Sequence, residues 1–101
     1  FFYMNKYIDI ANAAGAVKTV RATGVAAVAV DDTATPDTII IQYANGSKWT
    51  ITPSGVDDFT DADALKVADA IVDTASTNWR EVSSTFSGTL SQPILNLTFT
   101  F

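Results

Sequence analysis

The chain lacks both cysteine and histidine. Without cysteine it can form no disulfide, no thiolate metal site and no cysteine nucleophile. Without histidine it lacks the usual general base of enzymes and the commonest metal ligand of proteins. Serine and threonine hydroxyls are plentiful, but a hydroxyl nucleophile needs a base to activate it, and only carboxylates remain for that role. These absences predict a protein that is not an enzyme.

Charge is also scarce. Charged residues make up 17% of the chain, and eleven acidic against six basic residues give a net charge of −5, which opposes binding to phosphate backbones. No apolar run reaches the roughly 20 residues of a membrane-spanning helix, and no signal segment stands at the front. We therefore expect a soluble protein without a membrane partner, whose location stays open between a virion and a host cytoplasm.

Apolar residues, by contrast, make up 48% of the 101 residues and predict one folded domain over 1–101. The segment 39–51 is a β-hairpin whose register depends on its turn. A two-residue turn at Asn45-Gly46 would mix polar and apolar residues on both faces. A three-residue loop, Ala44 to Gly46 with Gly46 in the left-handed conformation of a bulge, separates them. Because a one-residue slip moves an apolar set across the sheet, we expect the second register. Its pairs are Ile41 with Trp49 and Ile39 with Ile51, while Ile40, Gln42, Lys48 and Thr50 share the other face.

One helix is predicted over about residues 61–78. Thr60 is a good N-cap, and Asp63 three residues later resembles a capping box. Apolar residues then recur at helical spacing; they are Leu65, Ala68, Ile71 or Val72, and Ala75. Asn78 is the expected end, and Trp79 is expected to fold back onto the core.

The remaining segments alternate as strands. They are Tyr7–Ile10, Val17–Val30 (two strands, or one bent at Gly24), 82–90, and Leu95–Phe101 with its leucines and phenylalanines inside. Strands, one helix and more strands predict an α+β domain. We expect a small antiparallel sheet or a part-closed barrel of five or six strands, with the helix covering an edge or an open end.

Candidate sites are few. The acidic cluster Asp57, Asp58, Asp61 and Asp63 resembles a calcium site in composition, but no glycine follows at the turn position and no glutamate closes the loop. Helix capping explains Asp61 and Asp63 without an ion. The adjacent carboxylates Asp31 and Asp32 splay apart, unlike the pair of a glycosidase. We therefore predict no catalytic, metal or cofactor-binding residue.

Nucleic-acid binding is the alternative function. Small barrels of the Sm and OB kinds bind RNA or single-stranded DNA through a basic groove and stacked aromatic residues. Lys18, Arg21 and Lys48 are the candidates for such a basic patch. The net negative charge opposes this function, as does the assignment of Tyr43 and Trp49 to the core face.

Several structural motifs together carry a resemblance. They are Tyr7-Ile8-Asp9-Ile10, the valine-rich run Val25 to Val30, the strand and glycine turn Thr38 to Gly46, an alanine-rich helix, and Trp79 followed by Val82. With this layout the chain resembles small uncharacterised proteins of marine tailed phages and marine metagenomes, from which its long C-terminal hairpin, Phe86 to Phe101, departs. The resemblance implies a structural, virion- or capsid-associated component and no catalytic residue.

The sequence therefore favours a non-enzymatic structural or interaction protein, acting as a homo-oligomer or on a larger protein shell. Open sheets have edges that need covering, and one helix cannot cover five or six strands. The candidate contact residues are Ile40, Phe1, Phe2 and Phe101. The competing expectation is that the helix and the N-terminal segment cover them within one molecule.

Overall fold

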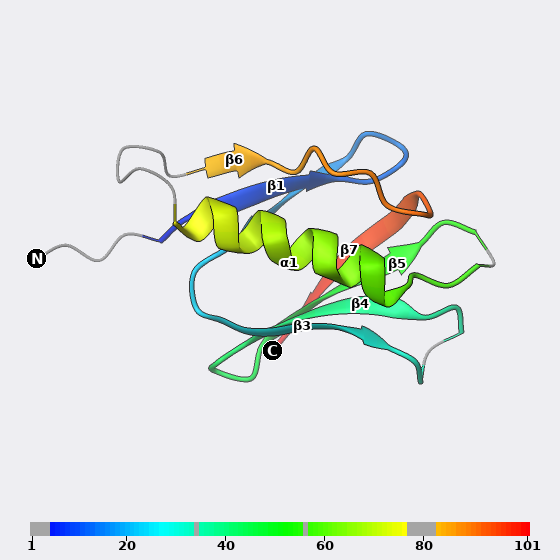
Figure 1. Cartoon of the computed structure of the whole chain (residues 1–101), viewed down its shortest axis with the longest axis horizontal. Coiled ribbons are helices and arrows are strands. Elements are labelled where there is room, and N and C mark those ends of the chain that lie inside the picture. Colours follow the sequence, from blue (N-terminus) through cyan, green and yellow to red (C-terminus); the bar gives the residue numbers. More distant parts are fainter. Residues whose placement is uncertain (1–4, 34, 56, 77–82) are drawn as a thin grey trace, which may run out of the picture.

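A computed structural model describes residues 5–33, 35–55, 57–76 and 83–101. It contains two small sheets and one helix (Figure 1). The elements are β1 (Tyr7–Ala11), β2 (Val17–Arg21), β3 (Val25–Asp31), β4 (Thr38–Tyr43), β5 (Lys48–Pro53), α1 (Asp61–Ala75), β6 (Ser83–Thr85) and β7 (Ile94–Thr100). The predicted α+β class with one helix is confirmed. The barrel alternative is wrong, because the described strands form separate sheets in the orders β2-β1-β6 and β3-β4-β5-β7.

The two sheets enclose the core together with α1. The helix packs against β1 and β3, so it closes one side of the space between the sheets (Figure 1). On the other side, β2 and β7 are outer strands of their sheets. The N–H of Ala13, in the β1–β2 turn, donates to the carbonyl of Ile94 at 2.8 Å. This bond joins the two sheets at the beginning of β7.

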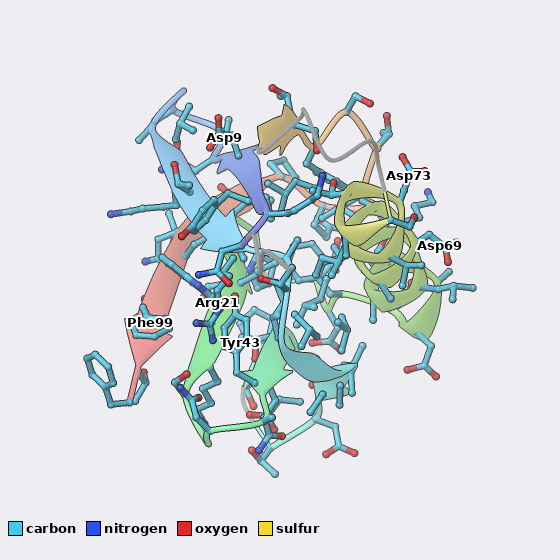
Figure 2. The ribbon with its side chains drawn as sticks, turned by 90° about the vertical axis from the view of Figure 1, so that its left-hand side faces the viewer. Asp9, Arg21, Tyr43, Asp69, Asp73 and Phe99 are labelled. Carbon is cyan, nitrogen blue, oxygen red and sulfur yellow. The ribbon has the colours of Figure 1, made fainter. Side chains whose placement is uncertain are left out.

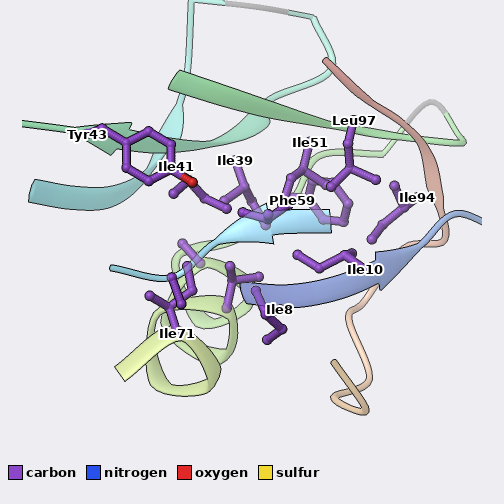
Figure 3. Packing of buried hydrophobic residues seen from close by; sticks show 14 residues of the cluster. Ile8, Ile10, Ile39, Ile41, Tyr43, Ile51, Phe59, Ile71, Ile94 and Leu97 are labelled. Carbon is purple, nitrogen blue, oxygen red and sulfur yellow. The ribbon is translucent and has the colours of Figure 1, made fainter. Parts of the chain in front are cut away.

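Isoleucine dominates the core (Figure 3). β-Branched side chains pack well on pleated surfaces, and each fully buried isoleucine contributes about 1.5–3 kcal/mol of burial free energy. The buried apolar residues are Ile8, Ile10, Val20, Ala22, Ile39, Ile41, Tyr43, Ile51, Phe59, Ala64, Val67, Ile71, Ile94 and Leu97. Every layer therefore contributes to a single cluster.

The hairpin register is the predicted one. Ile41 stands opposite Trp49 and Ile39 opposite Ile51. Gly46 has a φ of 91°, in the left-handed region that favours glycine. Local turn chemistry and the apolar pattern agree here, which is why the sequence was sufficient.

The helix begins as predicted, but its buried face is different. Thr60 and Asp63 form the capping box. The buried positions are Asp63, Ala64, Val67, Ile71 and Thr74. Of the predicted alternatives Ile71 and Val72, Ile71 is the buried one, whereas Leu65, 60% exposed, and Ala75 were wrongly assigned to the core. Two adjacent stripes of this helix have the same spacing, and periodicity cannot choose between them. The predicted end at Asn78 and the position of Trp79 lie outside the described residues.

Three findings correct or refine the predicted strands. The segment 17–30 forms two strands, as in one of the two predicted alternatives, and they belong to different sheets. The strand predicted over 82–90 is only Ser83–Thr85, and Val82 lies outside the described residues. This strand pairs in parallel with β1 and not with β7, so the C-terminal hairpin prediction was wrong. Leu97 is buried, but Leu95, Phe99 and Phe101 are exposed, against the prediction for this strand. A register shift between Thr52 and Pro53 places Ile94, rather than Leu95, against the core.

Among the described residues, no helix has the length and apolar character needed to cross a membrane.

Candidate functional site

The open side of the sandwich holds a groove with a volume of about 390 Å³. Five aromatic residues from four strands and from the residue after β7 line it: Tyr7, Tyr43, Trp49, Phe99 and Phe101. Arg21 is the one charged residue among the described residues that line it. Thr19, Asn45 and Ser47 complete the lining.

The strand registers bring these residues together. Trp49 stands opposite Ile41 on β4 and opposite Phe99 on β7, so all three share the core-facing side of their sheet. In the other sheet, Tyr7 stands opposite Arg21 at the end of the β1–β2 pair. The groove therefore lies at the end of the first sheet that carries Tyr7 and Arg21. There the first sheet does not cover the aromatic residues of the second sheet.

Three of the aromatic side chains, Trp49, Phe99 and Phe101, form a continuous row. The ring centroids of Trp49 and Phe99 are 5.2 Å apart with an interplanar angle of 55°. Phe99 and Phe101 are 5.0 Å apart in an edge-to-face arrangement. These distances and tilts are typical of favourable aromatic pairs. Phe99 is 40% and Phe101 98% exposed, so the outer end of the row faces solvent.

Arg21 lies beside Tyr43 (Figure 2). Its guanidinium carbon is 4.8 Å from the centroid of the Tyr43 ring, within the range of a cation–π contact. The Tyr43 hydroxyl donates to the Arg21 carbonyl, and burial of that hydroxyl raises the pKa of Tyr43. In the part of the chain that the structure describes, the Arg21 Nε–H is buried and has no hydrogen-bond partner. Tyr43 thus holds Arg21 at the groove through both its ring and its hydroxyl.

The three basic candidates do not lie on one face. Lys18 stands opposite Ile10 and Arg21 opposite Tyr7. Because successive residues of a strand point to opposite faces, Lys18 and Arg21 lie on different faces of β2. Lys48 shares the outer face of the other sheet with its partner Gln42. Of the three, Arg21 alone lines the groove.

The candidate contact residues are also separated. Ile40 is half-buried on the outer face of its sheet, with Ala29 and Thr50 as its cross-strand partners. Phe101 lies at the exposed end of the groove. Phe1 and Phe2 lie outside the described residues.

Two residues of the acidic cluster, Asp58 and Asp63, have structural partners, whereas Asp57 and Asp61 are exposed. Asp63 is buried in the capping box, and an Asp58 carboxylate oxygen accepts the N–H of Asp37 at 2.8 Å. Partial desolvation, followed by the nearby charges of Asp58, Asp32 and Asp31, raises the pKa of Asp37. Within residues 5–33, 35–55, 57–76 and 83–101, no three acidic side chains are grouped so that they could hold a metal ion.

No family model, curated protein or solved structure matches the chain. The likeness to marine phage proteins therefore stays a prediction, and function has to be argued from the structure itself.

Sequence reasoning missed the groove. It placed Tyr43 and Trp49 on the core face, which is correct for the buried Tyr43, but it gave no sign that part of that face borders a groove. The available signal was the aromatic end of the last strand. Once paired with the hairpin, that end extends the aromatic row that Trp49 begins.

Proposed function

We propose that this protein is a non-enzymatic structural module that associates with further copies of itself through the free edge of β7. The observation that carries the proposal is an outer strand with little protection. β7 is seven residues long, contains no charged residue, and pairs with β5 alone among the described strands. Natural proteins usually guard such edges with lysine, proline, a bulge or a covering segment.

The other sheet edges are better protected. α1 packs against β3, and β6 is three residues long. β2 carries two basic side chains, Lys18 and Arg21, and charge on an edge strand discourages pairing with another chain. β7 is therefore the edge on which strand addition meets the least resistance.

The protection of β7 is limited to its first residues, where the register shift lies and the N–H of Ala13 donates to the carbonyl of Ile94. Asn12 donates from its side-chain nitrogen to the carbonyl of Leu95 at 3.2 Å, from the side away from β5. Backbone groups point to alternate sides along an antiparallel strand, so those of Leu97 and Phe99 point the same way as those of Leu95. These N–H and C=O groups are available to another strand.

A second copy of the chain suits this edge. Antiparallel pairing of two β7 strands about a twofold axis satisfies both edges at once and joins two four-stranded sheets into one. The exposed Leu95 side chain then gains apolar contacts across the axis. A larger protein shell that offers a free strand would be bound through the same groups.

The test is the mass in solution, measured by light scattering after size exclusion at low and near-physiological salt. Wild-type protein should be a discrete oligomer at both salts, since backbone pairing and apolar burial depend little on screening. Thr98→Lys puts a charge on the exposed edge strand and should lower the mass. Leu65→Lys makes the same charge change on the helix and should not. A wild-type monomer at all concentrations would refute self-association.

Single-stranded nucleic acid is the second candidate partner. The observation in its favour is the row of aromatic rings beside Arg21, because bases stack on such rings. Against it stand the net charge of −5 and the separation of Lys18 and Lys48 from the groove. Co-purified material that absorbs at 260 nm and is removed by salt would support this partner instead.

A further inference from the structure

We propose that the groove beside Arg21 is a binding site for a flat aromatic monoanion, such as an aromatic carboxylate. The carboxylate binds the guanidinium of Arg21, and the ring packs against Trp49 and Phe99. This site is separate from the β7 backbone groups on which the proposed self-association depends.

The guanidinium supplies the anion-binding half of the site. It has five N–H donors in a planar fork that matches a carboxylate. The Tyr43 ring, 4.8 Å away, fixes its position on one side. On another side lies Gly24, where an added Cβ would be in ordinary van der Waals contact with a guanidinium nitrogen, at 3.7 Å. Among the described residues of the groove, no acidic side chain neutralises Arg21.

The aromatic row supplies the second half. Trp49 and Phe99 are tilted by 55° to one another, and Phe101 continues the row edge-on. Aromatic faces left open to water favour a ligand that covers them with a flat ring of its own. The volume, about 390 Å³, falls within the range of small-molecule sites, which are mostly apolar with a few polar groups that fix orientation.

The charge balance favours a monoanion over a phosphate. Arg21 offers one positive charge, and Lys18 and Lys48 lie on other faces and cannot add a second. The protein carries a net charge of −5, which opposes the approach of a dianion more than that of a carboxylate. An aromatic carboxylate thus matches both the single cation and the apolar wall.

The test is a titration with 2-naphthoate followed by protein NMR. Two reporters lie in the groove: the indole N–H of Trp49 and the Nε–H of Arg21. Because the chain has two tryptophans, a Trp79→Phe background leaves one indole signal. Both reporters should shift together and saturate. The neutral analogue 2-naphthylmethanol should bind about tenfold more weakly, because it lacks the charge-assisted hydrogen bond.

Matched variants separate a specific site from general attraction to a cation. Arg21→Gln should weaken 2-naphthoate binding by about tenfold or more. Lys48→Gln makes the same charge change on the outer face of the second sheet and should leave the affinity unchanged. If Arg21→Gln does not fold, Phe99→Ala provides the second test, because this partly exposed side chain forms the wall and should also weaken binding.

Three results would overturn the proposal. One is the absence of any shift in the reporters at millimolar 2-naphthoate. Another is an equal loss of affinity in Arg21→Gln and Lys48→Gln. The third is tighter binding of adenosine monophosphate than of 2-naphthoate, which would assign the groove to nucleotides.

Discussion

The carboxylate of Asp63 links the beginning of α1 to the backbone of Ser91, which lies close before β7. One carboxylate oxygen accepts the N–H of Ser91 at 2.9 Å, and the other accepts the Ser91 hydroxyl and, at 2.9 Å, the N–H of Thr60. These bonds orient Asp63 toward the interior and fix the rotation of the helix about its axis. They also hold the turn from which β7 departs.

Asp63 should make stability dependent on pH. Burial alone would raise the pKa of its carboxyl, but the hydrogen bonds from Ser91 and Thr60 outweigh burial and lower the pKa below its usual value. A carboxyl with a lowered pKa in the folded state stabilises the fold fully above its unfolded pKa, about 3.9, and loses that contribution as the pH falls through the folded pKa. Acid should therefore weaken the fold.

The variant Asp63→Asn tests this dependence by urea unfolding at several pH values. At pH 7 it should lower the free energy of unfolding by about 1–3 kcal/mol, and the difference from wild type should shrink below about pH 4. Asp61→Asn, at an exposed position of the same helical turn, should have a much smaller effect. A difference that stays constant down to pH 2 would contradict the role assigned to Asp63.

Alanine substitutions distinguish the two possible buried faces of α1. Ile71 is 3% exposed, and Ile71→Ala should lower the free energy of unfolding by about 2–5 kcal/mol. Leu65 is 60% exposed, and Leu65→Ala should change it by less than about 0.5 kcal/mol. The reverse order in thermal or urea unfolding would show that the helix turns Leu65 toward the core.

The hairpin turn should depend on glycine at position 46. Gly46 has a φ of 91°, so Gly46→Ala should destabilise the protein by about 1 kcal/mol or more. Gly55 has an ordinary φ, and an added side chain there would meet its nearest neighbours at 3.5 Å or beyond, so Gly55→Ala is the matched control. Equal melting temperatures for the two variants would exclude strain at Gly46.

Ile40 tests whether copies meet at an edge or at a face. It is half-buried on the outer face of the second sheet, away from the β7 edge. Ile40→Lys should leave the fold intact, which circular dichroism would verify, and pairing through β7 predicts an unchanged mass in solution. A lower mass would move the contact to the face of the sheet and assign it to Ile40, as the sequence first indicated.

Features set by neighbouring residues could be predicted from the sequence. The hairpin register followed from the Asn45-Gly46 turn between alternating apolar residues, and the helix N-terminus followed from Thr60 and Asp63. The buried face of the helix could not be predicted, since it depends on packing against the distant strands β1 and β3.

The candidate site depends on long-range pairing in the same way. Arg21 and Tyr43 are 22 residues apart, and Phe99 reaches Trp49 only through the pairing of β5 with β7. The division of segment 17–30 between two sheets creates the open side of the sandwich. No local pattern in the sequence encodes that division.

Amide hydrogen exchange at Leu97 and Phe99, resolved by NMR and followed against protein concentration, tests the central claim most directly. Pairing through β7 predicts that both amides exchange rapidly in dilute protein and become protected as the concentration rises. The amide of Ile41, in an inner strand, should stay protected throughout. Rapid exchange at Leu97 and Phe99 in a sample shown by light scattering to be oligomeric would contradict association through this edge.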